Sequence, residues 1–477
     1  MAKRRGGSIA AYEMMIIVLL FVMQAAFQSQ ITPLGVVDEA LALLFMPSFC
    51  LWYIRKGHRL KVNRSLIFFL VFLGIFWIFG WISTAVNHYQ PMTNVLKDAY
   101  ANLKFFFAMG LGYTMFDRCR KEPLENRRGR TVFWIVLNLV IFVMFAAMVA
   151  DQIFHISDGE TRWVTQVWCS SLTYESYSFL VANAIFLVAV VMRFYEYYDR
   201  AILIPLIELL YVIYGTRRVK GIVMTFVILV LYFIFLKKGE KKKILINLVL
   251  FFGGIGAAAL AVFQMFYYYV ALGTESARAV LAMGGPYLAK IYFPLGTGWA
   301  TYGSAFSIHP YSEVYNITGM NVVWGLSEQY DMFISDTFWP MILGQTGVFG
   351  FLAYLAAFVI LLSWVWKRRG KKPSLFVPIV LLILYILVMS TGESAFVSPM
   401  AVSMGFWIGC MMSETDRRKT KIYRSLDGAL ADAKDSSVKP VQRYQGADDF
   451  NIDWTFDEEP GENPRVTKKY GRGEHGR

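Results

Sequence analysis

Apolar runs long enough to cross a membrane recur along most of this 477-residue chain, in which 56% of the residues are hydrophobic. A helix needs about 20 apolar residues to cross the hydrocarbon of a bilayer, where its backbone polar groups bond to one another. The runs therefore predict an all-α, polytopic transmembrane protein with about twelve spans. The predicted spans are residues 10–27, 34–54, 66–86, 103–116, 131–150, 177–192, 201–214, 219–236, 244–270, 339–366, 375–390 and 396–412.

Positive charge is distributed unevenly between the predicted loops. The formal net charge is +13, and most lysines and arginines lie in alternate loops or in the C-terminal tail. Cytoplasmic loops carry such an excess, which predicts a multi-pass protein of the cytoplasmic membrane with both termini in the cytoplasm. The same placement between spans disfavours nucleic-acid binding. The exceptions, on the predicted outer side, are Lys97, Lys104, Arg162, Arg217, Arg218, Lys220, Arg278 and Lys290.

Residues 271–338 form the longest interval before the C-terminal tail without a bilayer-length apolar run. They are predicted to be one large external loop between the ninth and tenth spans, held at one membrane surface by the helices. Residues 1–412 are predicted to form the transmembrane domain. Residues 413–477 mix charge with glycine and proline, which predicts a basic, disordered cytoplasmic tail because such a composition buries little apolar surface.

Metal, nucleotide and disulfide chemistry have no support in the sequence. Of the four cysteines, only Cys169 faces outward in the predicted topology, so no exported pair can form a disulfide. The chain has no CxxC, HExxH or Walker motif. Neither a metal nor a cofactor is expected.

Two arginines occupy a tight turn between apolar helices on the predicted outer side. Arg217 and Arg218 must lie at or just below the membrane surface, where they either anchor lipid headgroups or bind an anion. Arg278 faces the same side, which favours the anion. A guanidinium pairs with phosphate through two parallel hydrogen bonds, and it stabilises charge that develops on a departing diphosphate.

A sugar transferred from a lipid diphosphate to a hydroxyl also requires a base within hydrogen-bond reach. Asp336 precedes the predicted span 339–366 and is either that base or an N-cap of the helix. His309 is either a second candidate base or a structural residue of a polar turn. Asp38 and Glu39, at the outer end of the second span, are interpreted as structural. The remaining outer carboxylates of this loop considered as bases are Asp331, Glu328 and Glu313.

Four features together resemble the O-antigen ligase/polymerase family of bacterial membrane glycosyltransferases. The first two are the turn Gly215-Thr216-Arg217, and Arg278 followed by the segment PLGTGWATYG at residues 294–303. The third is the loop-to-helix element SDTFWP at 335–340, which continues to GQTGVFG at 344–350. The fourth is the order of many spans, one large late external loop and a few closing helices. Gly296 and Gly298 allow either a tight turn or a close approach of the backbone to a sugar.

The resemblance implies a GT-C-like, metal-independent, inverting glycosyltransferase. The donor would be a glycan on undecaprenyl diphosphate, and the acceptor a second lipid-linked repeat unit. Asp336 stands where ligase members carry histidine, which favours a capsule, exopolysaccharide or O-antigen polymerase. The catalytic residues would be Arg217 and Arg278 on the diphosphate and Asp336 as base. The substrate-binding residues would be Arg218 in support of these arginines, together with Gly296, Gly298, Tyr302, His309 and Tyr311.

Two alternatives remain open. An O-antigen ligase would transfer the glycan to a lipid or protein acceptor instead. A lipid-linked glycan flippase would carry more charged residues within its spans than this chain does. The lipid bilayer, a chain-length regulator and a flippase are the further partners that a polymerase implies.

Overall fold

The computed structural model describes residues 6–55, 64–117, 123–157, 160–161, 168–233, 262–263, 266–369 and 372–416. The chain divides into the units Met1–Lys419 and Thr420–Arg477, and all the described residues belong to the first. Residues 417–477, which include nearly all of the predicted tail, lie outside the described residues.

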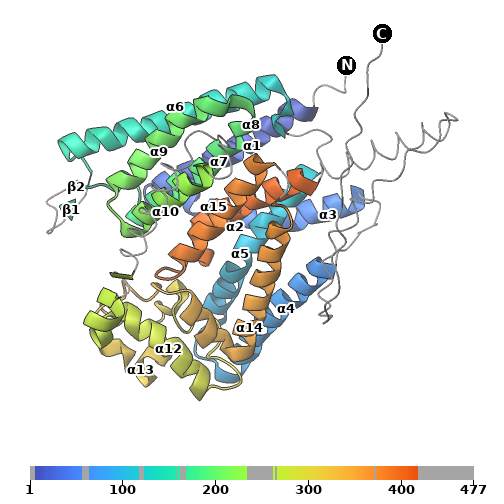
Figure 1. Ribbon diagram of the computed structural model, residues 1–477. Coiled ribbons are helices and arrows are strands. Elements are labelled where there is room, and N and C mark those ends of the chain that lie inside the picture. Colours follow the sequence, from blue (N-terminus) through green and yellow to red (C-terminus); the bar gives the residue numbers. More distant parts are fainter. Residues whose placement is uncertain are drawn as a thin grey trace, which may run out of the picture. The chain divides into compact units, whose positions relative to one another are not determined.

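Helices account for nearly all of the described secondary structure, as predicted (Figure 1). The only strands in these ranges are the short antiparallel pair β1 (Glu160–Thr161) and β2 (Trp168–Cys169). The helices are α1 (Gly6–Phe27), α2 (Val37–Leu43), α3 (Phe45–Arg55), α4 (Arg64–Asn87), α5 (Met92–Asp117), α6 (Arg127–Phe154), α7 (Tyr177–Arg193), α8 (Tyr195–Tyr198), α9 (Leu203–Gly215), α10 (Val219–Leu231), α12 (Ala277–Ile291), α13 (Glu313–Ile317), α14 (Trp339–Trp366), α15 (Pro373–Met389) and a last helix over residues 399–416.

Five of the described helical segments are long and apolar enough to cross a membrane. A sixth is reached if the broken pair Tyr177–Arg193 and Tyr195–Gly215 counts as one span. The protein is therefore helical with several candidate membrane spans. Helix is present in the described part of every predicted span. Most of 244–270 lies outside the described residues, and the count of about twelve remains a prediction. The five segments are Ile9–Phe27, Thr32–Ile54, Arg64–Asn87, Arg127–Phe154 and Trp339–Trp366.

Helix α7 lies in the centre of the helical bundle. Every residue from Leu180 to Arg193 is buried. A helix that is apolar around its whole circumference must be surrounded by other helices or by lipid, and here α9 and α15 pack against it. A second layer pairs α4 with α14, where the Phe76 ring lies 4.8 Å from Tyr354 and 5.4 Å from Trp299.

Two pairs of oppositely charged side chains are buried between the described helices. Lys104 Nζ lies 2.6 Å from Asp38 Oδ2, and both side chains are almost fully buried. Arg193 Nη2 lies 2.8 Å from Glu414 Oε2, with both side chains fully buried. Removing one partner of such a pair leaves an uncompensated buried charge, so both pairs fix how their helices pack. The Asp38 contact agrees with the structural role predicted for that residue.

The predicted external loop is a folded element with its own hydrophobic core. Its buried side chains come from α12, from α13 and from the segments between them, and include Leu281, Leu288, Tyr302 and Tyr315. Figure 1 shows α12 and α13 close together at the end of α14. The loop is therefore fixed against the helices rather than extended into solvent.

Glycines join this folded loop to the spans. Gly298 has a φ of +100°, and its N–H donates to the Gln345 carbonyl of α14 at 2.9 Å. Gly347 interrupts α14 with a φ of +69°, and a Cβ there would lie 2.4 Å from the Leu295 carbonyl carbon. A Cβ on Gly296 would likewise lie 2.4 Å from the Gln345 backbone. The two glycine motifs of the sequence thus pack backbone against backbone, which other residues would prevent.

Candidate active site

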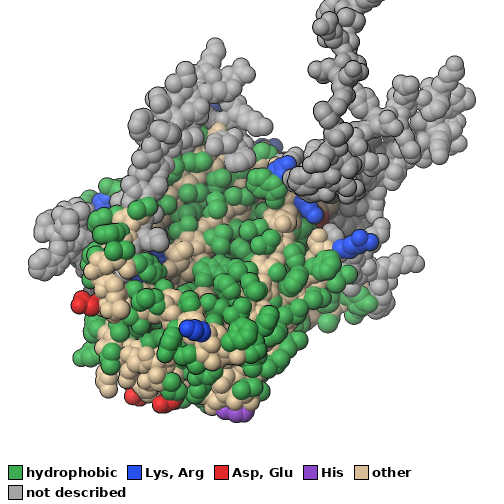
Figure 2. Space-filling model, turned by 60° about the horizontal axis from the view of Figure 1, so that its bottom comes forward, with side chains coloured by type: hydrophobic (Ala, Val, Ile, Leu, Met, Phe, Trp, Pro, Cys, Tyr) green, Lys and Arg blue, Asp and Glu red, His purple; other side chains and the backbone are tan. Residues whose placement is uncertain are grey.

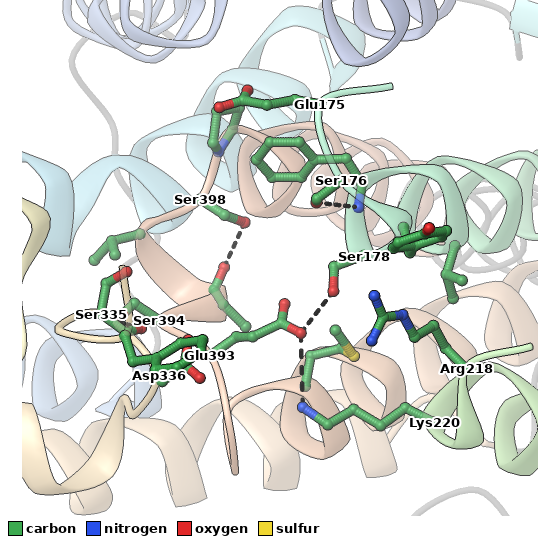
Figure 3. Close-up of a pocket in the computed structure, with 18 of the residues that line it drawn as sticks. Glu175, Ser176, Ser178, Arg218, Lys220, Ser335, Asp336, Glu393, Ser394 and Ser398 are labelled. Atoms are coloured by element: carbon green, nitrogen blue, oxygen red, sulfur yellow. Dashed lines mark hydrogen bonds and ion pairs between the residues drawn. The ribbon is translucent and has the colours of Figure 1, made fainter. Parts of the chain in front are cut away.

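A cavity of about 690 Å³ lies where the ends of several helices meet the folded loop. Segments far apart in the sequence line it, and Figure 3 shows the polar side chains that point into it. The lining comes from the start of α7 (residues 175–179 and 181), the start of α10 (218–221), Arg278 of α12, Ala305, the segment before α14 (332, 333, 335 and 336), and the end of α15 with the turn after it (389, 393–395 and 397–399).

Charged groups of both signs face this cavity. Arg218 and Lys220 lie on one side and Asp336 on the other, with Glu393 between them (Figure 3). Arg278 also lines the cavity, and its Nε lies 2.9 Å from Asp336 Oδ2. Three cations with carboxylates beside them suit an anionic ligand that is able to displace a carboxylate from an arginine.

Asp336 is a largely buried carboxylate paired with an arginine. Its side chain is 16% exposed, and burial raises the pKa of the carboxyl above its ordinary value although the charge of Arg278 opposes that shift. The alternative that Asp336 caps the following helix is wrong. The N-cap of α14 is Phe338, and no side chain makes a capping hydrogen bond there.

Glu393 and Lys220 line the cavity although neither was predicted as a site residue, and Lys220 was named only among the cations of the predicted outer side. Lys220 Nζ lies 3.8 Å from Glu393 Oε1, and Ser178 Oγ donates to the same oxygen at 2.7 Å. None of the residues that the structure describes accepts a hydrogen bond from Lys220 Nζ. The sequence does hold one indication of Glu393, because this residue falls in the short turn between the predicted spans 375–390 and 396–412. That turn is on the predicted outer side, as are the predicted site residues.

Gly392 marks the point where two of the cations converge. A Cβ built on this glycine would lie 3.0 Å from Lys220 Nζ and 3.8 Å from Arg278 Cζ. This glycine therefore lies beside both an ammonium and a guanidinium, and an oxyanion bound at this point would be near both cations.

The arginines of the predicted turn differ in position. Arg218 lines the cavity, and its guanidinium carbon lies 4.2 Å from the centre of the Tyr177 ring. Arg217 is absent from the lining, and its guanidinium lies over the Tyr214 ring at 3.8 Å. The structure therefore brings Arg218, Arg278 and Asp336 together and leaves Arg217 beside the cavity.

The other predicted substrate-binding residues do not line the cavity. Tyr302 is fully buried, and its hydroxyl donates to the Leu281 carbonyl. The Tyr311 hydroxyl donates to the Leu326 carbonyl at 2.5 Å. The His309 side chain is exposed, and its carbonyl accepts from Asn94 Nδ2 at 2.8 Å.

Gly296 and Gly298 are likewise absent from this lining, and the role of all five residues around a sugar stays a prediction. Tyr302 and Tyr311 hold the folded loop together, and the two glycines join it to the spans.

Within the described ranges, no group of three or more His, Cys, Asp or Glu side chains is arranged to hold a metal ion. Comparison of the chain with protein-family models and with curated proteins found no match.

Proposed function

We propose that this protein is a membrane polysaccharide polymerase. It joins oligosaccharide repeat units carried on undecaprenyl diphosphate, at the outer face of the cytoplasmic membrane and with both termini in the cytoplasm. The observation that carries the proposal is the cavity in which Arg218, Lys220 and Arg278 face Asp336 and Glu393 at the ends of apolar helices. A lipid diphosphate brings its charge to this depth of a membrane.

The cations bind the diphosphate of the donor. Lys220 and Arg278 converge on the space above Gly392, and Arg218 lines the same cavity. Negative charge on the diphosphate oxygen grows as the bond to the sugar breaks. Fixed cations stabilise that charge more in the transition state than in the ground state.

Asp336 acts as the base. When the diphosphate pairs with Arg278 in place of Asp336, the carboxylate loses the positive charge that lowers its pKa. Burial then raises the pKa of Asp336 and makes this carboxylate a stronger proton acceptor. The acceptor hydroxyl oxygen attacks the anomeric carbon from the face opposite the diphosphate, and its proton passes to Asp336. The bond between carbon and diphosphate oxygen breaks with its electron pair on the diphosphate, so the configuration inverts.

Glu393 holds the ammonium of Lys220 in this arrangement. The carboxylate lies within ion-pair distance of Lys220 and is itself fixed by the hydroxyl of Ser178. A flippase that delivers the units and a regulator of chain length are the partners such an enzyme would have in the cell.

The direct test is incubation of the purified protein with lipid-linked repeat units. A polymerase produces a ladder of products that differ by one repeat unit. No flippase is needed in this assay, because both substrates reach the enzyme directly in detergent. A product found only on a lipid or protein acceptor of another kind would show a ligase instead. If neither donor nor acceptor is consumed while the protein is folded, the proposal is wrong.

Replacement of Gly392 by alanine should raise the KM for the lipid-diphosphate donor by about tenfold, since small displacements of a binding group carry large costs. The added methyl would lie 3.0 Å from Lys220 Nζ, and a flexible lysine can move away, so the fold is retained. Steady-state kinetics with varied donor measure the effect. Gly74→Ala is the matched control because nothing lies within 4 Å of a Cβ there. An unchanged KM for Gly392→Ala would remove Lys220 from the diphosphate site.

A further inference from the structure

Helix α12 presents an apolar stripe that no described side chain covers. Met283, Tyr287 and Ile291 are 53%, 52% and 53% exposed, and Phe293, just beyond the helix, is 63% exposed. Residues four apart lie on the same face of a helix. The opposite face carries Leu281 and Leu288, which are fully buried, so α12 is apolar on both sides.

The exposed stripe continues onto the outer surface of α14. The Phe293 ring lies 6.2 Å from the ring of Phe349, which is 47% exposed. Leu352 and Val359 follow along α14 and are 53% and 58% exposed. Because α14 is a candidate membrane span, this exposed apolar side is the one that lipid would contact.

The depth of α12 relative to the membrane follows from where α12 packs along α14. A Cβ on Gly285 would touch Pro340, and one on Gly344 would touch Leu288, so α12 lies beside the first turns of α14. Helix α14 has 28 residues, whereas about 20 cross the hydrocarbon. The basic residues Lys367 to Arg369 follow its other end, where they mark the far membrane surface. The first turns of α14 therefore project beyond the hydrocarbon on the cavity side, at the level of the headgroups.

We propose that α12 lies in the headgroup layer of the membrane surface next to the cavity, with its exposed stripe in contact with lipid. Tyr287 has the apolar ring and polar hydroxyl of residues enriched at this depth. Lys290 is exposed beside Ile291 and can reach lipid phosphates. Figure 2 shows hydrophobic side chains over much of this side of the molecule, with few charged ones among them.

This contact has a consequence for the cavity, because Arg278 lies in the first turn of the same helix. Contact of α12 with the membrane surface thereby fixes the depth, relative to the lipid headgroups, at which Arg278 contacts a ligand. The proposal concerns a lipid contact and does not depend on the polymerase reaction.

Spin labels at Tyr287, Ile291 and Phe293 test it. Single cysteines are introduced into a protein whose own cysteines are replaced, labelled, and reconstituted in vesicles of phosphatidylcholine and phosphatidylglycerol. Collision rates with oxygen, which concentrates in lipid, and with a water-soluble nickel chelate are then compared. The three labels should favour oxygen over nickel, as should a label at Leu352 of α14. A label at Glu313, an exposed charged residue of α13, should favour nickel.

Two outcomes would overturn the proposal. Labels on the stripe that behave like the label at Glu313 would place α12 in water. Labels protected from both reagents would show that protein covers the stripe. Since all three positions are exposed, labelling there leaves the packed face of α12 intact, and circular dichroism of each variant verifies the fold.

Discussion

Asp336→Asn is expected to lower the rate of glycan polymerisation by roughly 10²- to 10⁴-fold, the range that a general base contributes. Asparagine has the shape of aspartate but cannot accept the proton of the acceptor hydroxyl. The amide oxygen of asparagine can still accept the hydrogen bond from Arg278 Nε, and the Arg278 side chain is 26% exposed, so the protein should remain folded. The length and amount of the product ladder measure the loss, and thermal unfolding in detergent verifies the fold.

Asp331→Asn is the matched control, since it makes the same chemical change in the same loop at a residue that does not line the cavity. It should leave the rate nearly unchanged. Equal effects of the two substitutions, or a fully active Asp336→Asn protein, would exclude Asp336 as the base.

If Asp336 is the base, the direction in which kcat/KM changes with pH also follows. A base works only when deprotonated, and burial raises the pKa of Asp336. The fall of kcat/KM on the acid side should therefore occur above the pH at which an exposed aspartate titrates. Arg278→Gln removes a charge that lowers this pKa, so the acid limb should move to still higher pH. An acid limb unmoved by that substitution would contradict the pairing in the free enzyme.

Arg278→Lys is expected to lower kcat/KM by about 100-fold, which corresponds to about 3 kcal/mol of transition-state stabilisation. Lysine keeps the charge but lacks the planar fork that holds a phosphate through two hydrogen bonds. The shorter reach of its single ammonium also weakens the contact to Asp336. Kinetics of the purified variant at saturating acceptor give the size of the effect.

Arg217→Lys tests whether the diphosphate-binding role of Arg278 is specific to that residue or shared by any arginine near the membrane surface. Arg217 lies beside the cavity with its guanidinium over Tyr214, so its replacement by lysine should change kcat/KM much less than that of Arg278. A larger loss at Arg217 than at Arg278 would favour the original prediction from the sequence, in which Arg217 binds the diphosphate. Normal ladders from both variants would leave lipid-headgroup anchoring as the better explanation of these arginines.

The sequence by itself determined the helical class and the candidate spans. Hydrophobic runs are a local property, and in lipid each helix satisfies its own backbone hydrogen bonds, so no distant contact is needed to predict one. It also singled out Arg217, Arg218, Arg278 and Asp336 as charged residues near the predicted outer surface. The last three of these line one cavity in the structure, and Arg217 does not.

Only the tertiary structure decided which other residues share that cavity. Ser178 and Glu393 meet across 215 residues of sequence, and Lys220 joins them from a third segment, the start of α10. Such proximity depends on how helices pack, which hydropathy does not record. The same packing shows what surrounds the glycines of residues 294–298, for which the sequence left a tight turn or a sugar contact open. Gly296 lies against Gln345 of α14 and Gly298 against Thr84 of α4, in both cases at distances that a side chain would prevent.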